Sequence, residues 1–322
     1  MNSGGQDQEW DNTRRWVEGH LAPGERIGEV SALKGGWTSR MRRLEVARPG
    51  GAEAPYTLVL RSFVKPFYRR HAPQLLAREA TVLRLLEDSA VPAARLVAVD
   101  APGAVCEHPS LLMTHLPGSV RLDQDDDTAA RADLLAAQLA AVHALHVDDS
   151  HRPRTWQAWT APERVTVPQD TTRPALWARA VKAIDTPPPA YRGCFLHRDF
   201  HPGNVLFTGT GPTLALTGVV DWVETSWGPA DLDVAHCATT LALLHGPQAG
   251  LAFTDRYTAA GGRTLSEGRD HLYWRLLDTL AFAPDAEKVA VPWRELGRTD
   301  LTPSVLSQRL EDYLQALFDR YA

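Results

Sequence analysis

The residues between 195 and 221 carry the side chains best suited to chemistry. They include the segment 197–204, His-Arg-Asp-Phe-His-Pro-Gly-Asn, in which four residues separate an aspartate from an asparagine. A turn at 208–212 and an apolar run at 213–220 follow, and Asp221 ends that run. The stretch therefore has the pattern H-R-D-x-x-x-x-N, then a hairpin, then an aspartate at the end of a strand.

Phosphoryl transfer needs these residue types in this arrangement. A carboxylate accepts the proton of the attacking hydroxyl, and Mg²⁺, which prefers hard oxygen ligands, neutralises the triphosphate. In the kinase template the base and one metal ligand share a loop, and the second ligand follows a hairpin. Asp199 is the candidate base, and Asn204 and Asp221 are the candidate Mg²⁺ ligands. Each alone would fit a capping, turn or surface residue, but the joint pattern favours catalysis.

Short strands and turns fill the first 115 residues. Strands are expected at 25–33, 40–46, 56–64, 95–99 and 110–114. Helices are expected over 11–20 and from about Pro73, a favoured first-turn residue, to about Glu87. This order predicts a β-rich N-lobe over residues 1–115.

The rest of the chain is mostly helical. After a break at Leu116-Pro117-Gly118, an Ala/Leu-rich helix is expected from Asp127, whose carboxylate would cap it, to about His146. Most segments beyond about Ala230 are also helical in pattern. The fold class is therefore α+β, with a small β-rich N-lobe at 1–115 and a larger helical C-lobe at 116–322.

Composition is that of an ordinary globular protein, with 44% hydrophobic and 23% charged residues. The net charge of −5 gives no support for a nucleic-acid partner. Residues 1–100 hold 15 Lys+Arg and 12 Asp+Glu, whereas the remaining residues hold 19 and 27. This division suits a polyanion at one end and a cation at the other, although chance surface variation gives the same pattern.

Three scattered cysteines without a CxxC pair, a polar start without a signal-peptide core and short apolar runs all favour a cytoplasmic protein. No run approaches the roughly 18 apolar residues of a membrane span. P-loop, Rossmann, serine-hydrolase and zinc-protease motifs do not occur.

The sequence HRDFHPGNVLF followed by GVVDW resembles the aminoglycoside phosphotransferase family, which shares its fold with choline kinases and eukaryotic protein kinases. His201 is typical of the small-molecule branch. Residues 228–235 resemble a later Gly-Pro…Asp-Leu-Ala block of the family, and by spacing Asp233, not Asp231, is its aspartate. The resemblance covers about residues 25–245. It implies a bilobal protein-kinase-like fold, with Asp233 bracing the backbone of the catalytic loop.

The N-lobe is expected to bind the nucleotide. Gly35 and Gly36, in the turn that ends at Ser39, would let backbone N–H groups approach the phosphates, although a plain hairpin turn fits equally. Arg61 stands where the family most often has Lys, and Lys65 on the same face is the alternative. Glu79 is the expected helical partner of this cation.

The resemblance also assigns residues to the nucleotide base and the acceptor. Met113 would line the adenine pocket, and main-chain groups of Thr114 and Leu116 would bond the base edge; for Met113 core packing is the alternative. His143, His236 and Cys237 are expected to be packing residues. Four tryptophans lie where the family builds its acceptor pocket, with core packing as the alternative: Trp156, Trp159, Trp177 and Trp274.

These features together predict an Mg²⁺-dependent phosphotransferase that moves the γ-phosphate of ATP or GTP to a hydroxyl of a small molecule. The acidic C-lobe favours a cationic acceptor, and hence an aminoglycoside or similar antibiotic and a role in antibiotic resistance. The alternatives are a metabolic kinase acting on choline, homoserine or a sugar, and a nucleotide-binding pseudokinase. The oligomeric state stays open.

Overall fold

A computed structural model describes residues 10–322 except 34–38, 50–53 and 124. Residue contacts divide the chain into two compact units. The first contains residues 1–116 together with Asp221–Val223, and the second contains 117–220 and 224–322. Gly35 and Gly36 lie outside the described residues.

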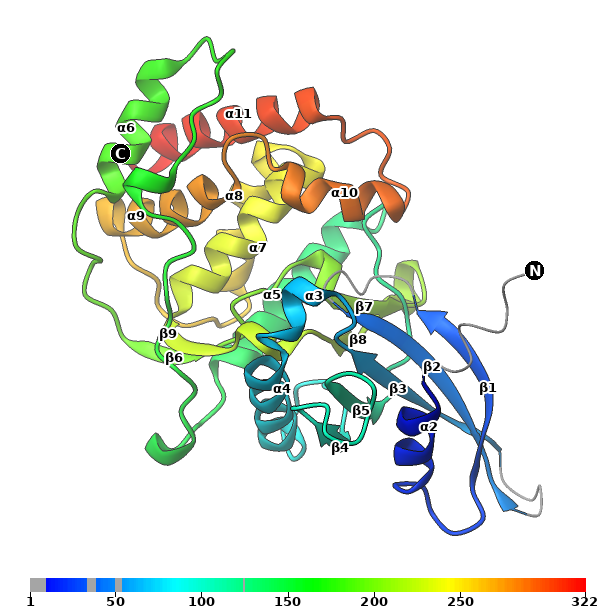
Figure 1. Ribbon diagram of the computed structural model, residues 1–322. Coiled ribbons are helices and arrows are strands. Elements are labelled where there is room, and N and C mark those ends of the chain that lie inside the picture. Colours follow the sequence, from blue (N-terminus) through cyan, green and yellow to red (C-terminus); the bar gives the residue numbers. More distant parts are fainter. Residues whose placement is uncertain (1–9, 34–38, 50–53, 124) are drawn as a thin grey trace. The chain divides into compact units, whose positions relative to one another are not determined.

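An antiparallel five-stranded sheet forms the centre of the first unit (Figure 1). Its strands are β1 (Arg26–Leu33), β2 (Arg40–Ala47), β3 (Tyr56–Ser62), β4 (Leu96–Asp100) and β5 (Ser110–Thr114). Their spatial order is β1-β2-β3-β5-β4, so β3 is central and its last five residues are all buried. This position explains how an arginine of β3 comes to lie in the interior.

Among the described residues, the helices α2 (Asp11–Glu18), α3 (Pro66–Arg69) and α4 (Ala72–Leu86) accompany the sheet. α2 packs Val17 into the core formed by the sheet, and Glu107 accepts the N–H groups of Asn12 and Thr13 at 2.7 and 2.9 Å. These bonds satisfy first-turn donors that have no partner inside the helix. α4 packs against β4 and β5 through apolar residues at helical spacing, as its sequence predicts, and it also buries Glu79.

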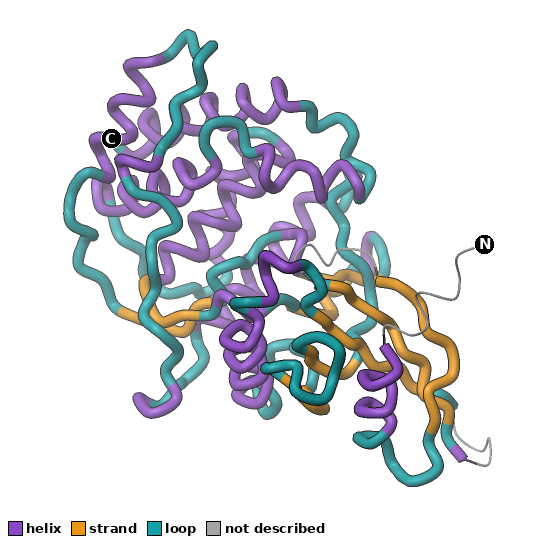
Figure 2. Tube along the Cα trace, in the orientation of Figure 1, coloured by secondary structure: helices purple, strands orange, loops and turns teal. Residues whose placement is uncertain are grey.

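The second unit is built around one fully buried helix. Its helices are α5 (Thr128–His143), α6 (Pro174–Ile184), α7 (Ala230–His245), α8 (Pro247–Ala259), α9 (Gly268–Thr279), α10 (Glu287–Glu295) and α11 (Pro303–Tyr321). α7 is buried from Ala230 to Leu244 and packs against α8, α9 and α11. Figure 2 shows how far helices, drawn in purple, predominate in this unit. Polar side chains on such a helix need partners, because unpaired buried polar groups are costly. No helix within the described residues is long and apolar enough to cross a membrane.

Two short antiparallel ribbons hold the chemically interesting loop of the second unit. β6 (Gly193–Leu196) pairs with β9 (Ser226–Pro229), and β7 (Val205–Thr208) pairs with β8 (Ala215–Val219). The loop 197–204 runs from the end of β6 to the start of β7. The hairpin expected after this loop is therefore present.

The expected cap of α5 is wrong. The helix begins at Thr128, but the carboxylate of Asp127 makes no capping hydrogen bond and instead accepts the N–H of Gly211 at 3.1 and 3.2 Å. Asp127 already has helical dihedral angles (φ −84°, ψ −1°). Capping residues usually have extended angles, which aim the side chain at the first-turn N–H groups.

Gly118 permits a tight approach at the start of the second unit. Its φ is +104°, and a Cβ built there would lie 2.6 Å from Thr217 Oγ1 and 2.8 Å from the Phe207 carbonyl oxygen. Ser119 exchanges two backbone hydrogen bonds with Phe207, so this backbone cannot easily move away.

We expect Gly118→Ala to lower the free energy of unfolding by about 3 kcal/mol, because backbone strain and overpacking add. Gly246→Ala is the matched control, since Gly246 has φ +97° but open space around its Cβ position. The control should show the strain alone, about 1 kcal/mol. Denaturant unfolding measures both, and equal losses would contradict the steric argument.

Candidate active site

The loop 197–204 has a strained backbone that a buried carboxylate holds in place. Arg198 has φ of +72°, a left-handed conformation that is unfavourable for any residue but glycine. Asp233 on α7 accepts the N–H of His197 and the N–H of Arg198, each at 2.8 Å. The expectation that Asp233 braces the loop backbone is therefore confirmed.

The side chain of Asp233 is itself held in place by His143. Burial would raise the pKa of its carboxyl group, but a hydrogen bond from His143 and nearby positive charge keep that pKa below the ordinary value. His143 Nε2 lies 3.2 Å from Asp233 Oδ2, and His143 Nδ1 lies 2.7 Å from the Tyr257 hydroxyl. His143 is thus a fully buried structural residue, as expected, and it links α5, α7 and α8.

The carboxylate of Asp199 is held through both oxygens. The side-chain amide of Asn204 donates to Asp199 Oδ2 at 2.9 Å and to the Asp199 carbonyl at 2.9 Å. His236 Nε2 lies 3.2 Å from Asp199 Oδ1, and His201 Nε2 lies 3.8 Å from the same oxygen. Burial would raise the pKa of Asp199, yet His201 and His236 hold it well below its usual range. The side chain is 31% exposed, so an ionised, oriented carboxylate reaches the surface of this unit.

His236 is buried and packs against aromatic rings, as expected, but it also contacts two carboxylates. Besides Asp199 it contacts Asp278 on α9, with His236 Nδ1 3.0 Å from Asp278 Oδ1. Burial alone would lower the pKa of His236, but the carboxylates of Asp278 and Asp199 raise it to about 9. Sequence reasoning missed Asp278 altogether, because only the packing of α7 on α9 brings it to this histidine. Cys237 is buried, as expected for a packing residue.

Asn204 is placed to offer an oxygen atom. Because its amide nitrogen donates to Asp199, its Oδ1 is the atom suited to a cation. The Asn204 carbonyl accepts the N–H of Val220 at 3.0 Å, and the Val220 carbonyl accepts from His197 Nε2 at 3.0 Å. The residue before Asp221 is thus tied to both ends of the loop. By its contacts Asp221 belongs to the first unit, so its convergence with Asp199 and Asn204 stays a prediction.

The first unit brings four predicted residues together around one guanidinium. Arg61 Nη1 donates to the two oxygens of Glu79 at 2.9 and 3.0 Å and to Asp221 Oδ1 at 3.0 Å, and Arg61 Nε donates to Ser39 Oγ at 3.1 Å. Burial would lower the pKa of Arg61, but Asp221 and Glu79 raise it above its ordinary value. Arg61 thus has the expected glutamate partner, whereas Lys65 is exposed just before α3.

Three predicted nucleotide-base residues lie at the end of β5. Met113 is buried and pairs with Val59 of the central strand. The N–H of Thr114 donates to the carbonyl of Arg95 at 2.9 Å. Leu116 is the last residue of the first unit before Asp221. Their roles in binding stay predictions.

The tryptophans divide into two groups. Trp177 and Trp274 are fully buried, which agrees with the packing alternative. Trp159 packs its ring edge-on against His236 with centroids 4.9 Å apart, and the Arg198 guanidinium lies 4.2 Å from the Trp159 centroid. Trp156 is partly buried and contacts Trp274. An acceptor pocket built by these rings stays a prediction.

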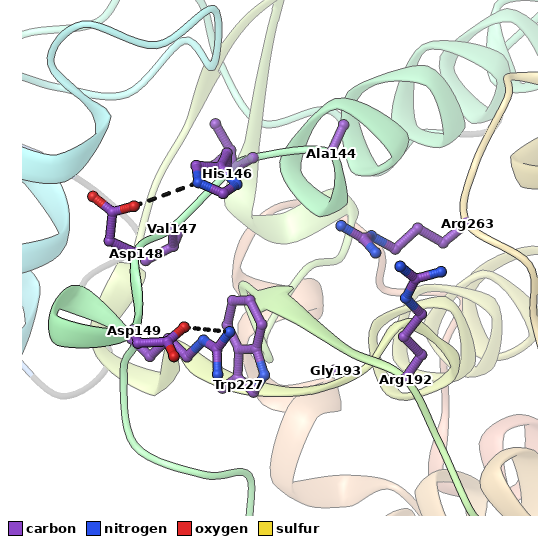
Figure 3. Close-up of a pocket in the computed structure, with 11 residues that line it drawn as sticks. Ala144, His146, Val147, Asp148, Asp149, Arg192, Gly193, Trp227 and Arg263 are labelled. Atoms are coloured by element: carbon purple, nitrogen blue, oxygen red, sulfur yellow. Dashed lines mark ion pairs between the residues drawn. The ribbon is translucent and has the colours of Figure 1, made fainter.

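A pocket of about 480 Å³ lies elsewhere in the second unit (Figure 3). Its lining includes Gly193, the first residue of β6, whereas the loop of Asp199 follows the last residue of that strand. Arg192 and Arg263 extend their guanidinium groups toward one another there (Figure 3). None of the residues 197–204 lines this pocket.

Comparison with known proteins fits this geometry. The model of the phosphotransferase enzyme family matches residues 29–274, which is more than half of the chain, so the protein belongs to this family of enzymes. No curated protein sequence matches the chain.

Solved structures share the architecture along almost the whole chain. One, from Ralstonia eutropha and assigned to the aminoglycoside phosphotransferases, is 17% identical with a TM-score of 0.62, covering 96% of this chain and 99% of its own. A macrolide 2′-phosphotransferase is 19% identical with a TM-score of 0.55, covering 96% and 97%. A spectinomycin phosphotransferase is 13% identical with a TM-score of 0.57, covering 96% and 97%. These likenesses confirm the α+β, protein-kinase-like fold.

We expect Asp233→Asn to lower the free energy of unfolding by about 3 kcal/mol or more, because one of the two charge-assisted hydrogen bonds is lost, the other is weakened, and an amide N–H faces a backbone N–H group. Asp231→Asn is the matched control. Asp231 is also buried on α7 but accepts one backbone N–H, that of Ser266 at 3.0 Å. Its replacement should cost about 1.5 kcal/mol. Denaturant unfolding compares the two, and equal costs would contradict the bracing role.

Proposed function

We propose that this protein is a small-molecule O-phosphotransferase that moves the γ-phosphate of ATP or GTP to a hydroxyl group. One observation carries the proposal: Asp199 is an ionised, partly exposed carboxylate, held by Asn204 and His236 on a loop braced by Asp233. A structural carboxylate would be satisfied by its partners in the interior. Asp199 instead presents lone pairs to solvent, as a proton acceptor must.

In the proposed reaction Asp199 orients the acceptor hydroxyl and takes its proton. The hydroxyl oxygen forms a bond to the γ-phosphorus, the bond to the β–γ bridging oxygen breaks, and the nucleoside diphosphate leaves. The low pKa of Asp199 makes it a weak base. This is compatible with phosphoryl transfer, because a loose transition state depends mostly on positioning and charge neutralisation.

Asn204 and Asp221 would hold the magnesium ion. An amide oxygen and a carboxylate oxygen are hard donors of the kind that Mg²⁺ prefers, so the residues fit the metal. The Asp221 side chain is 34% exposed, and Arg61 engages its Oδ1, which leaves Oδ2 as the candidate ligand. When bound, the ion supplies positive charge to the β- and γ-phosphates.

Arg61 would bind the phosphates from the first unit, with Ser39 and Glu79 fixing its guanidinium group. Gly35 and Gly36 would supply backbone N–H groups to the phosphates, and Lys65 stays the alternative cation. The base would lie against Met113, between the main-chain groups of Thr114 and Leu116. The donor nucleotide is supported by similar structures that are described as complexes with ADP or AMP-PNP.

The acceptor that we propose is a cationic antibiotic of the aminoglycoside type, which would make the protein a resistance enzyme. Similar structures are described as complexes with spectinomycin, hygromycin B and amicoumacin. The surplus of acidic residues beyond residue 100, with 27 Asp+Glu against 19 Lys+Arg, favours a positively charged acceptor. The enzyme would act in the cytoplasm, where ATP and Mg²⁺ are available.

A mass-spectrometric screen tests this function. Purified protein, Mg²⁺ and ATP or GTP are incubated with aminoglycosides, macrolides, peptide antibiotics, choline, homoserine and sugars. One added phosphoryl group on an antibiotic supports the proposal, and one on choline, homoserine or a sugar makes the protein a metabolic kinase. Nucleotide binding without transfer to any acceptor would instead indicate a pseudokinase.

Asp199→Asn should lower turnover by at least roughly 100-fold, because the acceptor proton loses its recipient. Calorimetric binding of Mg-nucleotide should be nearly unchanged. Asp148→Asn, which alters an exposed carboxylate lining the separate pocket, is the control and should be as active as wild type. Near-normal turnover of Asp199→Asn would remove Asp199 from the proposed role.

Asp221→Ala should weaken Mg-nucleotide binding by roughly tenfold or more, a loss of about 1.4 kcal/mol or more. Binding of the same nucleotide in EDTA should not weaken, because removing Asp221 leaves the charge of Arg61 to the phosphates. Glu87→Ala, at an exposed position after α4, is the control. An unchanged affinity for Mg-nucleotide contradicts the metal assignment.

A further inference from the structure

A line of three side chains, of which Asp278 and His236 are buried, runs from α9 to the loop 197–204. Asp278 Oδ1 lies 3.0 Å from His236 Nδ1, and His236 Nε2 lies 3.2 Å from Asp199 Oδ1. His236 is 4% exposed and the Asp278 side chain is 2% exposed. Both nitrogens of the ring therefore face carboxylates, one in the interior and one at the site.

The aromatic surroundings prevent this imidazole from turning. Phe282 stacks on it with centroids 5.7 Å apart and an interplanar angle of 25°, and Trp159 packs edge-on at 4.9 Å. Asp278 Oδ2 is buried and has no hydrogen-bond partner among the described residues. Within the described structure His236 is thus the hydrogen-bond partner of the Asp278 carboxylate, which favours a ring protonated on both nitrogens, in agreement with its raised pKa.

The side chains around Asp199 are spaced like the ligands of a metal site, but the positions of the histidine protons favour another role. Donor atoms of Asp199, His201 and His236 lie within 4.8 Å of one another. His201 Nδ1 accepts the N–H of Gly203 at 3.0 Å, so the proton of the neutral ring lies on Nε2. Both histidines then present N–H groups to Asp199, whereas a metal ion needs their lone pairs.

We propose that His236, fixed by Asp278, is a positioning residue for Asp199. Its Nε2–H holds one carboxylate oxygen while Asn204 holds the other, so the carboxylate cannot rotate about its terminal torsion. The remaining lone pairs then keep a constant direction toward the acceptor hydroxyl. This inference rests on the proposed function and adds a residue to the same site.

Two variants separate hydrogen bonding from packing. His236→Phe keeps an aromatic ring against Phe282 and Trp159 but has no N–H. It should lower kcat roughly 10- to 100-fold, the scale that misplacement of a reacting group produces, and leave KM for nucleotide within about twofold. His236→Gln has an amide N–H that can reach Asp199, and it should recover kcat to within about fivefold of wild type.

His271→Phe is the matched control. His271 is a buried histidine on α9 with a carboxylate neighbour, its Nδ1 lying 3.5 Å from Asp231 Oδ1, and it has no contact with the loop 197–204 in the described structure. Its replacement should leave kcat unchanged. Rates are measured with the acceptor that the screen identifies, or as Mg-ATP hydrolysis where water is the acceptor, and thermal melting confirms that each variant is folded.

A spectroscopic readout is independent of turnover. At pH 7 the ¹⁵N resonances of the His236 ring should show both nitrogens protonated in the wild type, and Asp199→Asn should shift the Nε2 resonance. A ring with one unprotonated nitrogen that responds to Zn²⁺, together with loss of zinc inhibition in His236→Phe, would make the cluster a metal site and overturn the inference.

The kinetic outcomes distinguish this inference from the proposed function. If the wild type turns over and His236→Phe matches it, the positioning role is wrong and the phosphotransferase stands. Equal losses of kcat in His236→Phe and His236→Gln, with the control unaffected, would also overturn it, because packing would then explain the effect. A wild type without turnover on any acceptor or on water removes the proposed function and this inference together.

Discussion

The buried carboxylate of Asp233 is the constraint on which the candidate site depends. Removing a carboxylate from water costs several kcal/mol, which only good partners offset. Here the partners are the N–H groups of His197 and Arg198 and the imidazole of His143. The same bonds hold Arg198 in a left-handed conformation that it would otherwise leave. The hydrogen bonds that compensate the buried charge of Asp233 on α7 therefore also fix the backbone next to Asp199, and with it the direction of the Asp199 side chain.

α7 extends this logic along its length. Because the helix is buried on all sides, polar side chains on it need hydrogen-bond partners, and these partners are the segments that the helix holds in position. Asp231 is bonded to Ser266, Asp233 to the loop 197–204, and His236 to both Asp199 and Asp278. A helix that served packing alone would carry apolar residues at these positions. Of its polar residues, Asp233 and His236 thus mark the part of the second unit at which chemistry is expected.

The elements and motifs that depend on local spacing could be predicted from the sequence. The contacts that depend on packing between distant segments could not. The strands, α4 and the loop 197–204 follow from periodicity and motif spacing, and the bracing by Asp233 follows from a family block. His236 and Asp278 are separated by 42 positions and meet only because α7 packs on α9. The carboxylate of Asp127 failed as a cap because it bonds Gly211, 84 positions away. Neither contact has a signature in the sequence near either residue.

The cluster around Arg61 supplies an electrostatic reason for a further cation. One guanidinium group is shared by two carboxylates, Glu79, which is buried, and Asp221, which is partly exposed. A single positive charge cannot neutralise both, so the cluster retains about one unit of negative charge when both are ionised. A cation at the exposed oxygen of Asp221 would cancel that surplus and release Arg61 toward phosphate oxygens. Among the described residues this cluster thus holds one carboxylate more than it holds guanidinium groups, which supports the proposed cation at Asp221.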